Sequence, residues 1–510
     1  MPANLTGTPA GSLRSIQYLR GLAAFMVVLY HAGHYLDVYR GDASLKRWDA
    51  LGLYGVSIFF AISGFLMATL VRRQDPSVFM AHRIVRIYPA LLIVVALYGA
   101  VSALVGRPFV LDPVALTLVP AGPRFYALDV EWTLLFEVTF YVALFLLALA
   151  GASRHLEKAA LAWLALILVG ALALPEWQGD LTPPIQRLPV MSACTGFAAG
   201  LLIPAALRAG LVPGWTWLLG CALAFLATVF LPGNDRFVAG LIAAMIVAGA
   251  VRADPGPGGQ AFDPLKKLGD WSYALYLCHV PAIRLTYQYA PAGADTKALW
   301  LGAIAAALGA GALVGTLDVR LYRHAKRIVD RSRPAPLRLW VGAYVALFAA
   351  VAAYGALDTA AKERRARAEE AILARLPAGS LRDPDAARAA IAAAGLSARA
   401  SLRGEVGEIQ LLEGGMLAVR GWLADLDDPG RELAVAVFHD GVKVASARPW
   451  RRRPDVAGAL GRPDLTSARI GFGLGTRPVR CREGRVVVLG LDLAGTALVL
   501  PGRTDIAGCS

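Results

Sequence analysis

Histidines inside long apolar stretches give this 510-residue sequence its first chemical signal. The stretch 18–37 contains His31 and, three positions later, His34. An ionisable side chain is costly inside a membrane, so each such residue marks a candidate site. Imidazole exchanges protons near neutral pH, and His31 lies deeper in the stretch than His34. We therefore predict His31 as a general base, against the alternative that a neighbouring helix merely satisfies its hydrogen bonds.

A carboxylate in a second apolar stretch gives the next signal. Thr133, Glu137 and Tyr141 recur every four residues and share one face of a predicted helix. An isolated carboxylate in such a helix must be paired, protonated or open to water. We interpret Glu137 as the acid that orients a catalytic histidine, as carboxylates do in other imidazole-based catalysts.

A polar stripe follows in the segment 269–281. Ser272, Tyr276 and His279 are spaced i, i+4 and i+7, which places them on one helix face. Two interpretations carry equal weight: hydrogen bonds between neighbouring helices, or contact with a substrate.

Two arginines stand just before the third apolar stretch. Arg83 and Arg86 are three positions apart and share a helix face. Guanidinium groups suit phosphate recognition, but simple anchoring on the cytoplasmic side explains basic residues here equally well.

The composition indicates which elements position these side chains. The chain is 57% hydrophobic and 17% charged, with a mean hydropathy of +0.53. A soluble protein has about 45–50% apolar and about 25% charged residues, so an ordinary globular domain and a disordered chain are both excluded. We predict an α-helical polytopic membrane protein with about eleven transmembrane helices. The predicted spans are 18–37, 51–70, 88–106, 126–150, 159–175, 188–207, 214–231, 236–251, 268–290, 298–319 and 338–357.

Basic connections predict the orientation. The segments 72–86 and 320–338 are rich in arginine and poor in acids, so both belong on the cytoplasmic side. The N-terminus is then cytoplasmic, without a cleaved signal peptide, and the C-terminal region is periplasmic in a bacterial inner membrane. Lys46 and Arg47, in the first outer loop, are a weak counter-signal. The net charge of +14 follows from such loops, so no nucleic-acid partner is expected.

The last third of the chain has a different pattern. We expect a membrane domain with ten helices at 1–337, an additional transmembrane helix at 338–357, a helical stalk at 358–402 and a small, mainly β domain at 403–510. Short apolar runs and the Asp440-Gly441 turn indicate a β-sandwich. The domain contacts glycan or a partner, or is purely structural. Cys481 and Cys509 both lie in it, where they form a disulfide or remain free thiols.

Taken together and in this order, these pieces resemble the membrane-bound acyltransferase 3 family, bacterial O-acyltransferases of cell-surface carbohydrates. The resemblance covers residues 14 to about 325. The matching segments are 16–24 with His31, 55–66, Arg83 with Arg86, 132–141 and 272–279.

The resemblance implies an enzyme that takes an acyl group, most often acetyl, from cytoplasmic acyl-coenzyme A. The acceptor is a hydroxyl of a cell-surface or exported polysaccharide or of its lipid-linked precursor. It implies that His31 and Glu137 are catalytic, the histidine acting as base or as acyl carrier. The implied coenzyme contacts are Arg83, Arg86 and Arg20, and the implied substrate contacts are His34, Trp132, Ser272, Tyr273, Tyr276 and His279. Membrane lipid and polysaccharide-assembly proteins are the expected partners.

No metal is expected, because the sequence has no Cys/His zinc spacing. Two other functions stay open. A transporter or flippase with a His/Glu proton relay would show paired repeats with broken helices, and the sequence shows none. A non-catalytic scaffold that displays the C-terminal domain is the second.

Overall fold

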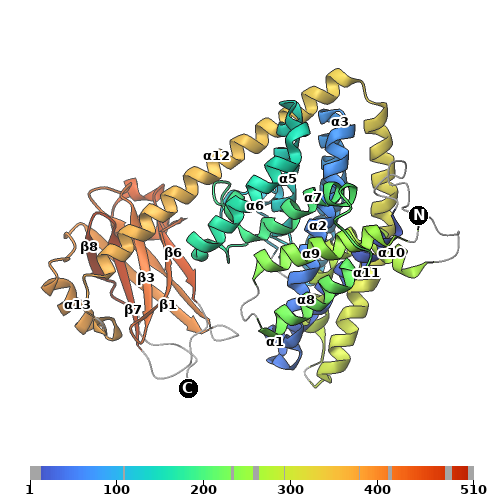
Figure 1. Cartoon of the computed structure of the whole chain (residues 1–510). Helices are drawn as coiled ribbons and strands as arrows, with labels where there is room; N and C mark the ends of the chain where they lie inside the picture. Colours follow the sequence, from blue (N-terminus) through green and yellow to red (C-terminus); the bar gives the residue numbers. More distant parts are fainter. Residues whose placement is uncertain are drawn as a thin grey trace. The chain divides into compact units, whose positions relative to one another are not determined.

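The computed structural model divides into two compact units, Met1–Thr359 and Ala360–Ser510 (Figure 1). It describes residues 13–106, 109–230, 235–254, 256, 263–291, 293–377, 379–411, 416–476 and 485–502, with the backbone alone at 46–49, 229–230 and 411. Cys481 and Cys509 lie outside the described residues, so their pairing stays a prediction.

The first unit is built of helices, as the composition predicts. Its helices are α1 (Arg14–Arg40), α2 (Asp49–Arg73), α3 (Pro76–Leu104), α4 (Pro113–Leu116), α5 (Trp132–Leu149), α6 (Leu156–Ala173), α7 (Thr195–Arg208), α8 (Thr216–Phe230), α9 (Arg236–Arg252), α10 (Pro264–Tyr289), α11 (Thr296–Arg331) and α12 (Pro334–Leu373). Each of the eleven predicted spans overlaps one of these helices.

The predicted count of eleven membrane crossings is not confirmed. Among the described residues, six helices are long and apolar enough to cross a membrane: α2, α3, α5, α6, α11 and α12. The helix α7 has 14 residues. At 1.5 Å per residue it is about 21 Å long, shorter than the hydrocarbon layer of about 30 Å.

Aspartates begin several of these helices. Asp75 precedes Pro76 and accepts hydrogen bonds from the amides of Ser77 and Val78 at 2.8 and 3.4 Å. Asp263 and Asp295 cap α10 and α11 in the same way. A capping carboxylate satisfies amides that have no partner within the helix, and it fixes the residue at which the helix begins.

Glycines let α1 and α10 pack closely. A Cβ at Gly269 of α10 would lie 2.1 Å from the carbonyl oxygen of Gln17 on α1. A Cβ at Gly21 of α1 would lie 3.1 Å from the amide nitrogen of Gly269. Small residues allow helix backbones to approach one another in membrane proteins. This crossing determines how closely the histidines of α1 and α10 can approach.

The second unit contains the small β domain that the sequence predicts. Two four-stranded antiparallel sheets have the orders β1-β2-β6-β5 and β4-β3-β7-β8. The strands are β1 (Leu402–Leu411), β2 (Leu417–Asp425), β3 (Leu433–His439), β4 (Val442–Ala447), β5 (Arg451–Arg452), β6 (Arg469–Gly475), β7 (Val486–Asp492) and β8 (Thr496–Val499). One apolar cluster joins the two sheets, and α13 (Pro384–Ala393) covers the other face of the β3–β7 pair. The short α14 (Pro454–Ala459) packs near the end of β2.

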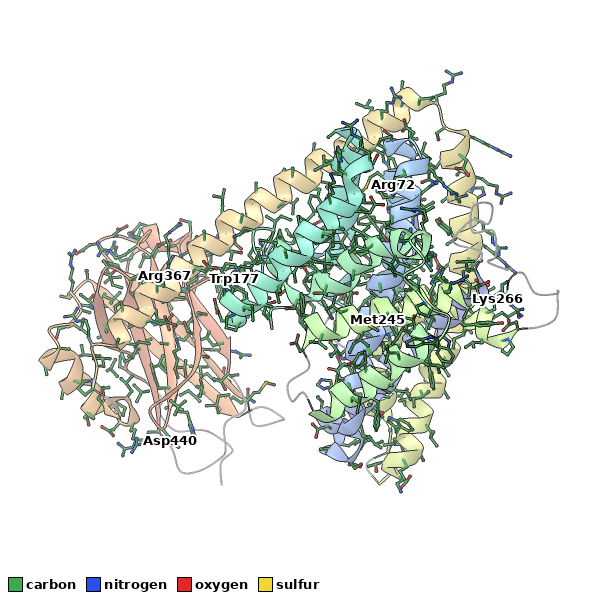
Figure 2. The ribbon with its side chains drawn as sticks, in the orientation of Figure 1. Arg72, Trp177, Met245, Lys266, Arg367 and Asp440 are labelled. Carbon is green, nitrogen blue, oxygen red and sulfur yellow. The ribbon has the colours of Figure 1, made fainter. Side chains whose placement is uncertain are left out.

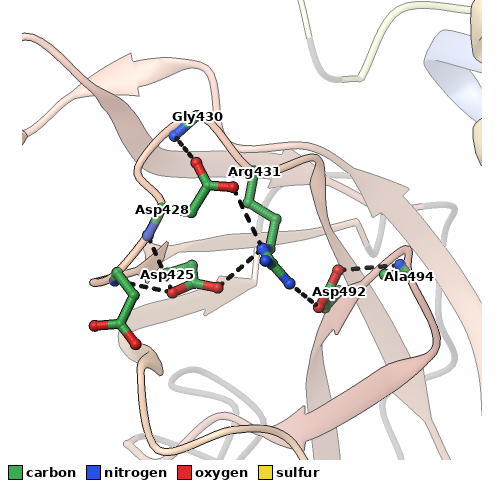
Figure 3. A network of polar contacts seen from close by, with 7 residues as sticks. Asp425, Asp428, Gly430, Arg431, Asp492 and Ala494 are labelled. Atoms are coloured by element: carbon green, nitrogen blue, oxygen red, sulfur yellow. Dashed lines mark hydrogen bonds and ion pairs between the residues drawn. The ribbon is translucent and has the colours of Figure 1, made fainter.

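An ionic network joins three strand ends in this domain (Figure 3). The guanidinium of Arg431 lies 3.0 Å from Asp425, at the end of β2, and 2.9 Å from Asp492, at the end of β7. Burial by itself would raise the pKa of Asp425. Hydrogen bonds from the Asp427 amide and the Ser401 hydroxyl, and the charge of Arg431, outweigh burial, so the pKa lies below its usual value.

Candidate functional site

A cavity of about 680 Å³ opens among the helices of the first unit. It begins at what we call the basic end, where α2 ends at Arg73 and α3 begins at Pro76. Arg72, labelled in Figure 2, lies at this end and donates a hydrogen bond to Glu157 at 2.8 Å. The polar lining residues are Gln17, Arg20, Ser63, Thr69, Arg73, Gln74, His82, Arg83, Arg86, Thr133, Glu137, Tyr141, Asp270, Ser272, Tyr273, Tyr276, Tyr322, Arg323 and Lys326.

Two arginines in the cavity lack an anionic partner. Within the described residues, neither Arg20 nor Arg83 makes an ion pair or a side-chain hydrogen bond. The Arg83 guanidinium lies 5.8 Å from the centre of the Tyr141 ring, and its Nε atom is buried. A buried cation is stable only when an anion or ordered water balances it. These two side chains are therefore available to an anionic ligand.

Arg86 has a different environment. It forms an ion pair with Asp318 of α11 at 2.9 Å, and Asp318 is buried. The rings of Tyr273 and Tyr322 lie 4.7 and 5.1 Å from its guanidinium. The charge of Arg86 is already balanced, so the two arginines that the sequence pairs are not equivalent.

Glu137 lines the cavity but does not reach His31. Its carboxylate accepts hydrogen bonds from the Tyr141 hydroxyl and, at 3.2 Å, from the Ser63 hydroxyl of α2. Within the described residues it makes no hydrogen bond to a histidine. The expected role of Glu137 as the acid that orients His31 is therefore corrected, because this carboxylate faces α2.

A second histidine takes the position beside His31. Nε2 of His279 lies 3.0 Å from Nδ1 of His31, which lies 3.0 Å from the Val27 carbonyl oxygen. Nδ1 of His279 lies 3.2 Å from the Leu275 carbonyl oxygen. A carbonyl only accepts, so both Nδ1 atoms carry hydrogen. When both rings are neutral, the single Nδ1 hydrogen of His31 is shared between the Val27 carbonyl oxygen and Nε2 of His279, and Nε2 of His31 is left unprotonated as a base.

A closed hydrogen-bond pair separates the cavity from these histidines. The Tyr276 hydroxyl lies 2.7 Å from Oγ1 of Thr133 and donates to the Val130 carbonyl at 3.0 Å. Tyr276 and Thr133 line the cavity, whereas neither His31 nor His279 does. The Tyr276 ring lies 5.7 Å from the ring of His279. We call the Tyr276–Thr133 pair the seal.

Two further residues of α10, Ser272 and Tyr273, line the cavity. The Tyr273 hydroxyl donates to the Ile87 carbonyl at 2.9 Å. The Ser272 hydroxyl is buried and has no hydrogen-bond partner in the described part of the chain. Tyr273 therefore joins two helices, while Ser272 keeps a polar atom for a ligand.

His34 and Trp132 belong to a group at the opposite end of the unit. The ring of Tyr30 lies 4.6 Å from His31 and 5.9 Å from His34. The Arg236 guanidinium lies 5.1 Å from the centre of the Trp132 ring.

Sequence reasoning missed several residues of this site. Asp318 is a lone acid in the apolar stretch 298–319, so the cost of an ionisable residue in a membrane is enough to mark it as a candidate site residue. Asp129 and Arg284, an ion pair at 2.6 Å beside Tyr35, carry no such signal because only tertiary structure brings them together. The described residues contain no group of three or more His, Cys, Asp or Glu side chains that would hold a metal ion.

Comparison with known proteins gives a family match and three curated relatives. The model of the Acyl_transf_3 family, an acyltransferase domain, matches residues 13–317. The chain is 30% identical over 285 residues to the exopolysaccharide production protein ExoZ of Rhizobium meliloti (strain 1021), covering 52% of this chain and 86% of that protein. It is 26% identical over 377 residues to the acyltransferase MdmB of Streptomyces mycarofaciens, covering 66% and 95%. The putative membrane-bound transacylase BcsY of Komagataeibacter xylinus shares 38% identity over 95 residues, 18% and 21% of the two chains. No solved structure matches.

Proposed function

The chain belongs to the acyltransferase 3 family, and from this premise we propose that it transfers an acyl group from acyl-coenzyme A to a hydroxyl of an exported polysaccharide or of its lipid-linked precursor. The family makes the chain an enzyme that transfers groups other than aminoacyl groups. We propose acyl-coenzyme A as the donor, a polysaccharide hydroxyl as the acceptor and acetyl as the transferred group. We also propose that the membrane histidines catalyse this transfer and do not form the proton relay of a transporter.

The observation that carries the donor assignment is the cavity with its two unpaired arginines. Coenzyme A carries several phosphate oxygens, and guanidinium groups bind such oxygens through paired hydrogen bonds. Arg20 and Arg83 supply these groups, while Arg86, held by Asp318, keeps Tyr273 and Tyr322 in place. The basic end then faces the cytoplasm of a bacterial inner membrane, and the second unit lies in the periplasm.

The acceptor assignment rests on the relatives. ExoZ is named for exopolysaccharide production, and BcsY is named a membrane-bound transacylase. A polysaccharide hydroxyl is a weak nucleophile, so its attack on a thioester needs a base at the point of reaction. The unprotonated Nε2 of His31 meets this need.

We propose the following reaction. His31 Nε2 takes the proton of the acceptor hydroxyl, and the oxygen attacks the thioester carbonyl carbon. The C–S bond of the tetrahedral intermediate then breaks, the ester remains on the sugar, and the coenzyme thiolate takes the proton from His31. His279 holds the His31 ring so that Nε2 faces the substrate throughout. Alternatively, His31 attacks the thioester and carries the acyl group before the hydroxyl arrives.

The test uses the full-length protein in lipid nanodiscs with radiolabelled acetyl-coenzyme A and polysaccharide from a strain that lacks the gene. We expect His31→Ala to lower kcat by about 10²–10⁴-fold and to leave coenzyme binding unchanged. His324→Ala, at an exposed histidine of α11, is the matched control and should keep full activity. Normal transfer by His31→Ala would refute the proposal. Mass spectrometry of protein incubated with donor alone distinguishes the two routes, because only an acyl carrier gains the mass of the acyl group.

A further inference from the structure

Arg236 is a cation without an anionic partner at the end of the unit opposite the basic end. It is the first residue of α9, is half-buried, and lies over the face of Trp132 at 5.1 Å. Its neighbour Asp235 does not balance it, because that carboxylate accepts hydrogen bonds from the amides of Phe237 and Val238 at 2.8 and 3.3 Å. Within the described residues, no other carboxylate pairs with Arg236.

Two aromatic side chains connect Arg236 with the reaction centre. Tyr30 lies within electrostatic range of the Arg236 guanidinium, and the Tyr30 ring lies 4.6 Å from His31. Trp132 precedes Thr133, which forms half of the seal. Arg236 therefore lies one aromatic side chain away from the proposed base, on the side of the seal away from the coenzyme cavity.

A neighbouring arginine shows how a structural cation is treated at this end. Arg284 pairs with Asp129 at 2.6 Å and also contacts the rings or hydroxyls of Tyr35 and Tyr39. The charge of that guanidinium is balanced by a carboxylate. The indole of Trp132 covers one face of the Arg236 guanidinium. Within the described residues, no carboxylate accepts a hydrogen bond from the edges of this guanidinium. Binding of an anion stabilises a half-buried cation in this state.

We propose that Arg236 and Trp132 form a subsite that binds an anionic group of the acceptor, so that the enzyme prefers an acidic glycan to a neutral one. This inference rests on the proposed function, since it names the acceptor of the same site. The shared chemistry is an oxyanion with two or more acceptor oxygens. Its two sources are a sugar carboxylate and the pyrophosphate of a lipid-linked precursor. The Trp132 indole holds the guanidinium in position for that anion.

The experiment measures steady-state kinetics of the full-length enzyme in nanodiscs made of neutral lipid. The donor is acetyl-coenzyme A, and the acceptors are a neutral oligosaccharide, the same oligosaccharide with one uronate residue, and the neutral oligosaccharide on polyprenyl pyrophosphate. Arg236→Gln removes the charge and keeps a hydrogen-bonding amide, and Arg236→Lys keeps the charge without the planar fork. Arg252→Gln is the matched control, because Arg252 ends the same helix and is exposed.

We expect Arg236→Gln to raise KM about 10- to 100-fold for the acidic acceptor that binds here, with kcat changed less than about twofold. KM for the neutral acceptor and for the donor should not change, and Arg236→Lys should fall between wild type and Arg236→Gln. The acceptor whose KM rises identifies the source, uronate or pyrophosphate.

Three results would overturn the inference while leaving the proposed function intact. The first is an equal rise in KM of Arg236→Gln for neutral and acidic acceptors, and the second is an unchanged KM for every acceptor. The third is a rise in KM that appears only when anionic lipid is added, which would assign Arg236 to a lipid headgroup. Failure of the wild-type enzyme to acylate any of the three acceptors would instead count against the proposed function. Thermal unfolding of each variant in the same nanodiscs shows whether a loss reflects misfolding.

Discussion

At the scale of single residues, the His31–His279 pair is the feature with the clearest chemical consequence. Two backbone carbonyls and one ring nitrogen determine which nitrogen of His31 is unprotonated. A group that orients a reactive imidazole in this way typically contributes about 10- to 100-fold. We expect His279→Ala to lower kcat by this factor with little change in the donor KM. His279→Gln, whose amide oxygen accepts from His31 in place of Nε2, should recover part of the rate. Equal losses in both variants would assign His279 a structural role only.

The two cavity arginines should respond differently to the same substitution. Arg83→Ala removes an unpaired cation, so we expect coenzyme A to bind at least about tenfold more weakly while thermal stability is kept. Arg86→Ala leaves the buried Asp318 without a partner, so we expect a loss of about 3–5 kcal/mol in stability. Isothermal titration of coenzyme A and thermal unfolding measure the two effects. The variant Arg86→Ala with Asp318→Ala should regain stability, and no recovery would contradict the ion-pair argument.

The sequence could indicate which residue types matter here but not which of them meet. The cost of placing an ionisable side chain in a membrane identifies His31, Glu137 and His279 as unusual. It does not show that His279 instead of Glu137 contacts His31, because that contact depends on how α1 and α10 cross. Chemical analogy predicts a histidine partner for Glu137, whereas the fold directs its carboxylate to Ser63 and Tyr141.

At the scale of helices, the glycine contact between α1 and α10 controls the distance between the histidines. A Cβ at Gly269 would lie 2.1 Å from the Gln17 carbonyl oxygen, so the helices must separate to accept it. We expect Gly269→Ala to lower both activity and thermal stability, by about 1–3 kcal/mol for the latter. Gly302→Ala on α11 is the control, since a Cβ there has open space. Unchanged activity in Gly269→Ala would show that the histidine contact tolerates a wider crossing.

The helices also show where hydropathy is informative. Apolar stretches located the helices of the first unit, but α7, α8 and α9 have only 14, 15 and 17 residues. Apolar composition alone predicts spans at 188–207, 214–231 and 236–251, because hydropathy does not show where a helix begins and ends.

In the β domain, the Arg431 network predicts a dependence on pH. The pKa of Asp425 is lowered in the folded state, so its contribution to stability is present above its unfolded value of about 3.9 and is lost as pH falls below it. We expect hydrogen exchange in β2 and β7 to accelerate between pH 5 and pH 3 more in wild type than in Asp425→Asn. That variant should be less stable by about 1–3 kcal/mol at pH 7. The same pH dependence in both proteins would mean that other carboxylates control the domain.

At the scale of the whole molecule, the change in composition near residue 358 predicts two kinds of structure, and the chain divides into two compact units after Thr359. The mainly β character of the second unit is confirmed, because its alternating runs and the Asp440-Gly441 turn are local signals.

The seal bears on whether protons can leak across the membrane through this enzyme. A cavity that reached His31 from the basic end would leave polar side chains and water across most of the bilayer, and protons would flow down their gradient. The Tyr276 hydroxyl contacts, at 2.7 and 3.0 Å, join α10 to α5 at the end of the cavity towards the histidines, so we expect them to block proton flow in the resting enzyme. We expect Tyr276→Ala to raise the proton conductance of proteoliposomes, measured with an entrapped pH dye. Tyr289→Ala, at the exposed end of the same helix, should leave it unchanged. Tight vesicles with Tyr276→Ala would mean that another element insulates the membrane.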